Sequence, residues 1–276
     1  MSAGASAAAG TTSQMSVRFG NFFTRNGKPG PALDIYDTPQ GQAAAPLLTG
    51  VAYGSVSTYV HPHLLANSQP NQAIATLYAL PAGEDPVADK ADDQSVGGVE
   101  DDGSHPQTTL LLEPSSDSSL GTGPLAGLSF STVVEKGDDN GSKGPAAPAP
   151  SSGQGEILVG TGPVTDLQTG TLGLYLINDS SCAPPVNGDT SFPGVPLIFN
   201  SDSARIQSAF AIFPTAPGTH QVSVVAWMSG NSPTCAQLTQ KQGTTSIDIA
   251  AGQQVEAYVY GTSLTDLHLA AAPIQR

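Results

Sequence analysis

The sequence has little positive charge. Nine Lys and Arg residues face 23 Asp and Glu residues, so the formal net charge is −14. A nucleic-acid-binding surface must neutralise phosphates, and this composition excludes one. Much of the acidic excess lies in residues 83–103, which hold eight acidic residues against Lys90 alone. Such a run is typical of a solvated, mobile loop, so we predict an acidic insertion there.

Helical periodicity and long apolar runs are also missing. No window repeats apolar residues at i, i+3, i+4 and i+7, and no run reaches the roughly 18–20 residues of a membrane span. The 31 Gly and 23 Pro residues suit short strands joined by turns. We therefore expect an all-β chain without a transmembrane segment.

Cysteines are few, and the N-terminus lacks the basic and then apolar pattern of an export signal. Residues 1–14 are rich in Ala, Gly, Ser and Thr, which is typical of a flexible tether behind a cleaved signal or a lipid anchor. We expect an exported protein, extracellular or at the cell surface, whose natural leader is replaced by Met1.

The two cysteines, Cys182 and Cys235, both follow predicted strands. An even pair in such a chain favours a Cys182–Cys235 disulfide, and two unrelated free thiols are the alternative.

The order of short alternating segments occurs twice. Residues 15–136 carry one series, residues 137–154 form a Pro/Gly/Ala/Ser linker, and residues 155–276 carry the second series. The segments "ALDIYDT", "AIATLYALPAG" and "LSFSTVV" match "TLGLYLI", "QVSVVAWMSG" and "VEAYVYG", with Tyr36 against Tyr175. Two halves of this size predict two tandem immunoglobulin-like antiparallel β-sandwich domains.

Alternation within the strands predicts which residues form the core. In the second half, one face of each strand is apolar, and such a face packs against the opposing sheet. These residues are Leu172, Leu174, Leu176, Val222, Val224, Ala226, Met228, Val255, Ala257 and Val259.

The stretch "ALDIYDTPQGQAAAPLLTGVAYGSVSTYV", residues 32–60, is similar to the start of a bacterial surface module, domain of unknown function 4397. In the second half, "FPTAPGTHQVSVVA" and "IDIAAGQQVEAYVYGTSLTDLHLAAAP" resemble its later hairpin and closing strands. Each copy departs from the pattern where the other is typical. The resemblance implies an exported, sandwich-like module of the cell envelope with no settled biochemical activity.

The polar residues of residues 32–60 have a structural interpretation. Gly54 within a strand indicates a bulge or a close backbone approach. Tyr53 and Tyr59 share a face with Val51 and are expected to fill space between sheets. Asp34 is expected to accept hydrogen bonds from a neighbouring turn or strand end.

Metal binding and catalysis find little support. His61 and His63 could supply two metal ligands, but Pro62 favours a loop and no third ligand is near. Asp138, Asp139 and Asn140 are calcium candidates in a glycine-rich turn, although a polar linker is the favoured interpretation.

The sequence also offers no framework for enzymatic chemistry. No G-x-S-x-G elbow occurs, and the acidic residues cluster in loops. We expect neither an enzyme nor a cofactor.

Two functions remain open. The first is a non-catalytic envelope or extracellular module that holds a protein partner, or its own copies, through sheet edges and loops. The second is a carbohydrate- or ligand-binding receptor, for which Trp227, Tyr258, Tyr260 and Phe192 are candidate contacts. Since aromatic residues make up only 6% of the chain, the first function is favoured.

Overall fold

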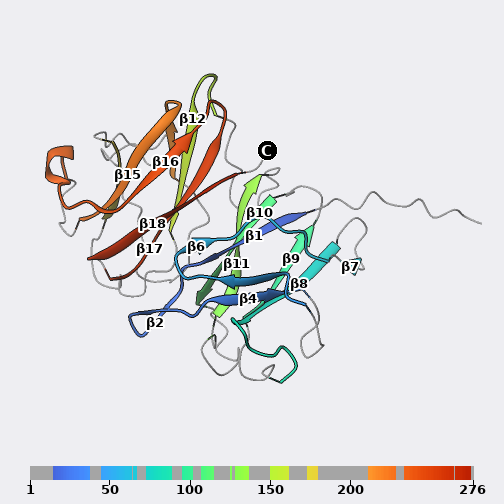
Figure 1. Ribbon diagram of the computed structural model, residues 1–276. Helices are drawn as coiled ribbons and strands as arrows, with labels where there is room; N and C mark the ends of the chain where they lie inside the picture. The colour runs from blue at the N-terminus through green and yellow to red at the C-terminus, as the bar shows by residue number, and fades with distance from the viewer. Residues whose placement is uncertain are drawn as a thin grey trace, which may run out of the picture.

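The computed structural model describes residues 15–37, 45–63, 65–66, 73–88, 95–101, 107–114, 125, 128–136, 150–161, 173–179, 211–227, 233–263 and 265–274. Within these ranges every regular element is a β-strand except η1 (Cys235–Gln237), one turn of 3₁₀-helix. The prediction of an all-β chain is confirmed (Figure 1). The tether 1–14 and most of the linker lie outside the described residues.

The N-terminal half contains two larger sheets and a small hairpin. The N-inner sheet has the order β11-β10-β1-β6, and the N-outer sheet has the order β5-β4-β8-β7 with β9 on the other side of β8. The strands are β1 (Ser16–Asn21), β4 (Leu33–Tyr36), β5 (Leu48–Val51), β6 (Ser55–Val56), β7 (Leu65–Ala66), β8 (Ala73–Pro81), β9 (Ser95–Asp101), β10 (Gln107–Pro114) and β11 (Leu128–Lys136). The hairpin joins β2 (Thr24–Arg25) to β3 (Lys28–Pro29).

The C-terminal half contains two further sheets. The C-inner sheet has the order β14-β12-β17-β18, and the C-outer sheet has the order β13-β15-β16. The strands are β12 (Gly155–Thr161), β13 (Gly173–Asn178), β14 (Ala211–Thr215), β15 (Gly218–Trp227), β16 (Gln242–Ile249), β17 (Gln254–Ser263) and β18 (Asp266–Pro273).

Three apolar clusters lie one after another in space between the four sheets. One cluster fills each half, and its members include Val17, Phe19, Ile35 and Leu77 in the first half and Ile157, Val222, Val224 and Val259 in the second. These packed pairs of sheets are consistent with β-sandwiches. The predicted core residues Leu176, Val222, Val224, Val255, Ala257 and Val259 are confirmed, and Ala226 packs against them half-buried.

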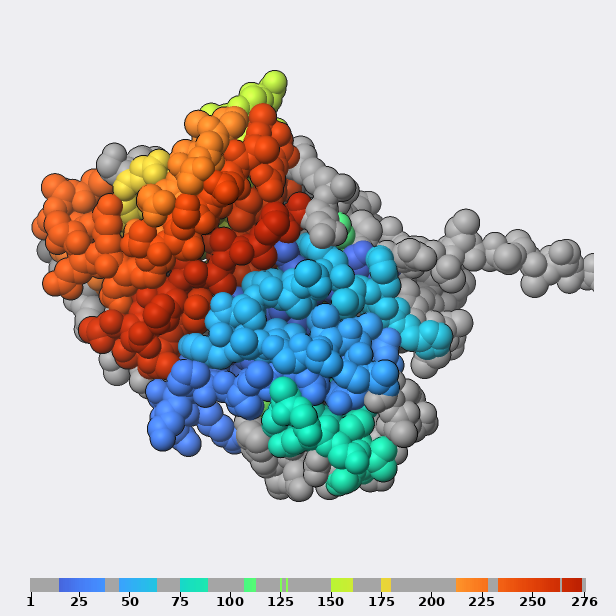
Figure 2. All heavy atoms as spheres, in the orientation of Figure 1, coloured from blue at the N-terminus to red at the C-terminus, as the bar shows by residue number. Residues whose placement is uncertain are grey.

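The third cluster joins the two halves. It contains Phe22 and Leu111 from the first half and Leu158, Ile212, Tyr258 and Ile274 from the second, all buried. The outward faces of the two inner sheets therefore pack on each other, and the surfaces of the described residues between 15 and 60 and of the last strands adjoin (Figure 2).

The inner sheets are mixed, which corrects the expectation of purely antiparallel sandwiches. Strand β1 runs parallel to β10, and β12 runs parallel to β17. Parallel neighbours need a long connection. In each half the intervening strands form this connection, because the second-to-last strand comes back beside the first strand of that half.

The parallel pairing sets opposite each other residues far apart in the sequence. Arg18 lies opposite Thr109 in the first half, and Leu158 lies opposite Glu256 in the second. By position in the sheets, β4 corresponds to β13 and β8 to β15, as the sequence matches predicted. The third match is wrong by one strand, because β17 occupies the position of β10, and β18 occupies that of β11.

The acidic insertion 83–103 contains a strand, so its prediction as a mobile loop is wrong for residues 95–101. These residues, "SVGGVED", form β9 and pair antiparallel with Ala73–Ala79 of β8 along their whole length. The acidic residues are concentrated outside the "SVGGV" segment, whose two valines favour a strand. Composition averaged over the insertion hides this short pattern.

Asp34 binds backbone groups of β5 and of the turn after β8. Its side chain is 8% exposed, and its two carboxylate oxygens accept hydrogen bonds from the backbone N–H groups of Gly50 (2.7 Å) and Gly83 (2.9 Å). Both glycines have positive φ angles, 63° and 89°, which other residues adopt at a cost. The predicted role of Asp34 is confirmed.

Candidate functional site

A buried polar network connects the two inner sheets. Arg18 of β1 and Glu256 of β17 form an ion pair of 2.6 Å, with side chains 2% and 0% exposed. The guanidinium also donates to the Thr109 hydroxyl (2.9 Å) and to the carbonyl of Pro273 (2.8 Å). Oxygen Oε2 of Glu256 accepts further hydrogen bonds from Thr109 (3.0 Å) and Tyr258 (2.5 Å).

The network compensates for the burial of two charges. An isolated buried ion loses several kcal/mol of solvation, which only good geometry and added hydrogen bonds offset. Arg18 gains a further contact because its guanidinium carbon lies 4.7 Å from the centre of the Tyr59 ring, a cation–π distance. The arrangement joins segments from both ends of the chain.

Aromatic rings continue the contact beside the network. Phe22 packs against Tyr258 with ring centroids 5.3 Å apart, and it stacks on Tyr260 at 5.1 Å. Tyr260 is also stacked by His268 at 5.3 Å and met edge-on by Tyr53 at 5.4 Å. Rings of Tyr53 and Phe22 from the first half thus enclose Tyr260 from the second.

We call this aromatic contact between the halves the seam, and its tyrosines Tyr53 and Tyr260 act as packing groups. Burial raises the pKa of Tyr53 to about 12, and Tyr260 and Asp266 add to the effect. Burial also raises the pKa of Tyr260, with a smaller contribution from Asp266. Both phenols therefore stay neutral at physiological pH, and neither is poised for proton transfer.

Gly54 allows this aromatic contact, but it lies in the turn between β5 and β6 and not within a strand as predicted, and the group that approaches it closely is the side chain of Tyr260. The φ of Gly54 is 78°, and a Cβ built on it would lie 2.5 Å from the hydroxyl oxygen of Tyr260. Gly27, in the exposed β2–β3 turn, offers a matched position because its φ is 67° and a Cβ would meet nothing within 4 Å.

We expect Gly54→Ala to lower the free energy of unfolding by about 2–4 kcal/mol, since it adds overpacking to left-handed strain. Gly27→Ala should cost only about 1 kcal/mol, the strain alone. Urea denaturation of the two variants measures the difference. Equal losses would contradict a tight contact between Gly54 and Tyr260.

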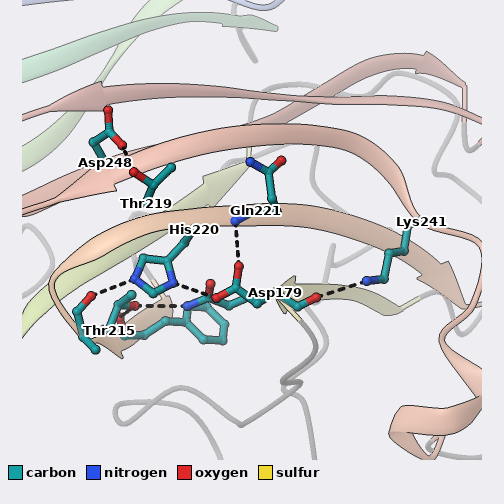
Figure 3. A network of polar contacts seen from close by, with 10 residues as sticks. Asp179, Thr215, Thr219, His220, Gln221, Lys241 and Asp248 are labelled. Carbon is teal, nitrogen blue, oxygen red and sulfur yellow. Dashed lines mark hydrogen bonds and ion pairs between the residues drawn. The ribbon is translucent and has the colours of Figure 1, made fainter.

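A second polar cluster lies at one end of the C-outer sheet (Figure 3). The ring of His220 contacts Asp179 Oδ2 through Nδ1 (2.8 Å) and the carbonyl of Ala216 through Nε2 (2.7 Å). The other oxygen of Asp179 accepts from the backbone N–H of Gln221 (2.8 Å), and Lys241 donates to the Asp179 carbonyl (3.1 Å). The pKa of Asp179 is lowered, chiefly by the hydrogen bond from the Gln221 N–H and next by the hydrogen bond with His220.

Several predicted site residues lie outside the described part of the chain. They are the calcium candidates Asp138, Asp139 and Asn140, the apolar contact Phe192 and Cys182. Cys235 begins η1 and is not a free thiol. Its pairing with Cys182 stays a prediction.

The predicted ligand-contact aromatics are placed differently from one another. Tyr258 is 0% exposed in the contact between the halves, so its proposal as a ligand contact is wrong. Tyr260 is half-buried, and its ring is in contact with Phe22, His268 and Tyr53. Trp227 is half-buried and packs on a cluster formed by Tyr175, Ile177, Val225 and Leu238.

The candidate metal ligands His61 and His63 do not converge on a described site. Nδ1 of His61 lies 3.1 Å from the carbonyl oxygen of Met15, and the backbone N–H of His63 donates to Asp37 (2.7 Å). Among the described residues, no three His, Cys, Asp or Glu side chains are grouped to hold a metal ion.

Sequence reasoning missed the partners in both polar clusters. Arg18 and Glu256 are charged residues within otherwise apolar strands, "SVRFGNFF" and "VEAYVY", and an isolated charge there is a signal for a buried pair. Asp179 and His220 carry no comparable signal. They meet because β13 and β15 are neighbours in the sheet.

Comparisons with known proteins add little. No known protein family matches the chain, and no curated protein matches it. One structural match concerns alpha-glucan recognition by family 41 carbohydrate-binding modules from streptococcal virulence factors. It covers 92% of this chain and 96% of that chain at 9% identity, but its TM-score is 0.23, which is too low to carry an argument. Within the described residues, no helix has the length and apolar character to cross a membrane.

Proposed function

We propose that the chain is a non-catalytic, exported module that serves a structural or protein-interaction role at the cell envelope or outside the cell. In this proposal the two halves are tandem immunoglobulin-like sandwiches, divergent copies of a module resembling domain of unknown function 4397. The surface partner, a protein or a second copy, would meet the loops and sheet edges.

The buried Arg18–Glu256 network is the observation that carries the proposal. Its charges are fully removed from solvent and are used to join the halves. A catalytic ion pair must instead reach a substrate. The strongest polar contacts of the module hold its two sandwiches together. Such a module is suited to presenting surfaces at a fixed spacing.

The exposed surface favours this role over sugar binding. Among the described side chains, the large hydrophobic residue that is clearly exposed is Val87, at 41%. Sugar-binding faces usually present aromatic rings to solvent, and the described tyrosines of the seam are packed on one another.

The test is a crosslinking pull-down from native cell envelope with the intact chain as bait, beside a glycan array. We expect crosslinks from a specific envelope protein, or from a second copy, to the loops and sheet edges, and no glycan signal above that of Trp227→Ala. A glycan signal that is abolished in Trp227→Ala, without protein crosslinks, would replace the proposal by the carbohydrate-binding function.

A further inference from the structure

The His220 ring sits between two oxygen atoms. Its Nδ1 is 2.8 Å from Asp179 Oδ2 and its Nε2 is 2.7 Å from the carbonyl oxygen of Ala216. The side chain is only 14% exposed, so water has limited access to it. Figure 3 shows the His220 ring beside Asp179, with a dashed line between them.

Both partners act as hydrogen-bond acceptors. A backbone carbonyl never donates, and a carboxylate donates only after it takes up a proton. The Gln221 N–H and the His220 ring lower the pKa of Asp179, so this carboxylate stays ionised well into the acidic range. A neutral imidazole has one N–H, so it satisfies one of the two contacts, whereas an imidazolium satisfies both.

The two contacts join separate parts of the C-terminal half. Ala216 belongs to the turn between β14 and β15, while Asp179 follows β13 and has a positive φ of 54°. A non-glycine residue in that conformation is held there by its surroundings. Asp179 also donates its own N–H to the carbonyl of Gln221 (2.8 Å).

Two other charged groups contact neighbours of His220. Lys241, from the segment before β16, contacts the Asp179 carbonyl, and Asp248 of β16 accepts from the hydroxyl of Thr219 beside His220 (2.6 Å). These bonds do not depend on the ring proton. In general, imidazole is the side chain that exchanges a proton near neutral pH.

We propose that His220 is a proton-operated clasp, which holds the β14–β15 turn to Asp179 when both ring nitrogens are protonated and releases one partner when the ring loses a proton. The clasp closes as pH falls. It opens again only at strongly acidic pH, because the lowered pKa of Asp179 means that its stabilising contribution is lost as pH falls through that value. This inference is independent of the proposed envelope role.

The test is a titration of the ¹⁵N-labelled full chain from about pH 5 to pH 9, followed on the histidine ring nitrogens and on the Gln221 amide. The matched control is His268, which also pairs with an aspartate, Asp266 Oδ1 at 2.9 Å, but is 47% exposed. We expect both ring nitrogens of His220 to carry hydrogens at the acidic end. The Gln221 amide shift should then move with the same midpoint as the ring.

Two variants separate the clasp from general effects. In His268→Gln the coupled titration of His220 and Gln221 should persist, and in His220→Gln the movement of the Gln221 amide should vanish. If His220→Gln does not fold, the comparison of the wild-type chain with His268→Gln decides alone. A single neutral tautomer of His220 across the whole range, or a Gln221 amide that ignores the ring, would overturn the proposal.

Discussion

Replacing Arg18 with methionine is expected to lower the free energy of unfolding by about 3–5 kcal/mol, because it leaves the buried charge of Glu256 without its partner. The substitution also removes the hydrogen bonds from the guanidinium to Thr109 and to the carbonyl of Pro273, which adds to the loss of stability. Equilibrium urea denaturation followed by far-ultraviolet circular dichroism measures it.

A double variant tests the origin of that loss. Arg18→Met with Glu256→Leu removes both charges and should recover a large part of the stability, because a buried apolar pair is often as stable as the ion pair it replaces. Lys28→Met, in the exposed β3, should change stability by less than about 0.5 kcal/mol. If the double variant is as unstable as the sum of the single variants, unpaired charge is not the cause.

Removing residues 95–101 is expected to destabilise the protein by more than about 3 kcal/mol, since it deletes β9 and leaves the edge of β8 unpaired along seven residues. Deleting residues 90–93 is the matched control, because this polar segment has nothing with which to form a core. Thermal denaturation compares the two deletions. Equal melting temperatures would mean that β9 adds nothing to the sheet.

Local patterns predicted the parts of the fold that depend on local chemistry. Alternating apolar residues such as Val222 and Val224 identified the core face, because a strand buries every second side chain. The role of Asp34 was predicted correctly, because a carboxylate beside backbone N–H groups accepts their hydrogen bonds, whereas Gly54 lies in a turn and not within a strand.

The contacts that join the halves depend on topology and could not be predicted in the same way. The parallel pairing of β1 with β10 turns Arg18 towards the other half, where it meets Glu256, 238 residues away in sequence. The sequence alone does not show how the halves pack, and it therefore predicts that Tyr258 lies on an open surface. Tyr258 does alternate with the core residues, but the sheet that covers it comes from the other half of the chain.

The separation of Arg18 and Glu256 along the chain also has a consequence for synthesis. A ribosome adds roughly 5–20 residues per second, so Arg18 precedes its partner by about 10–50 seconds. During that interval the first half can fold, but its arginine and the neighbouring Leu111 and Phe22 have no second half to cover them. The nascent chain therefore presents an apolar face with a cationic centre, which is a surface that chaperones would have to shield until translation reaches β17.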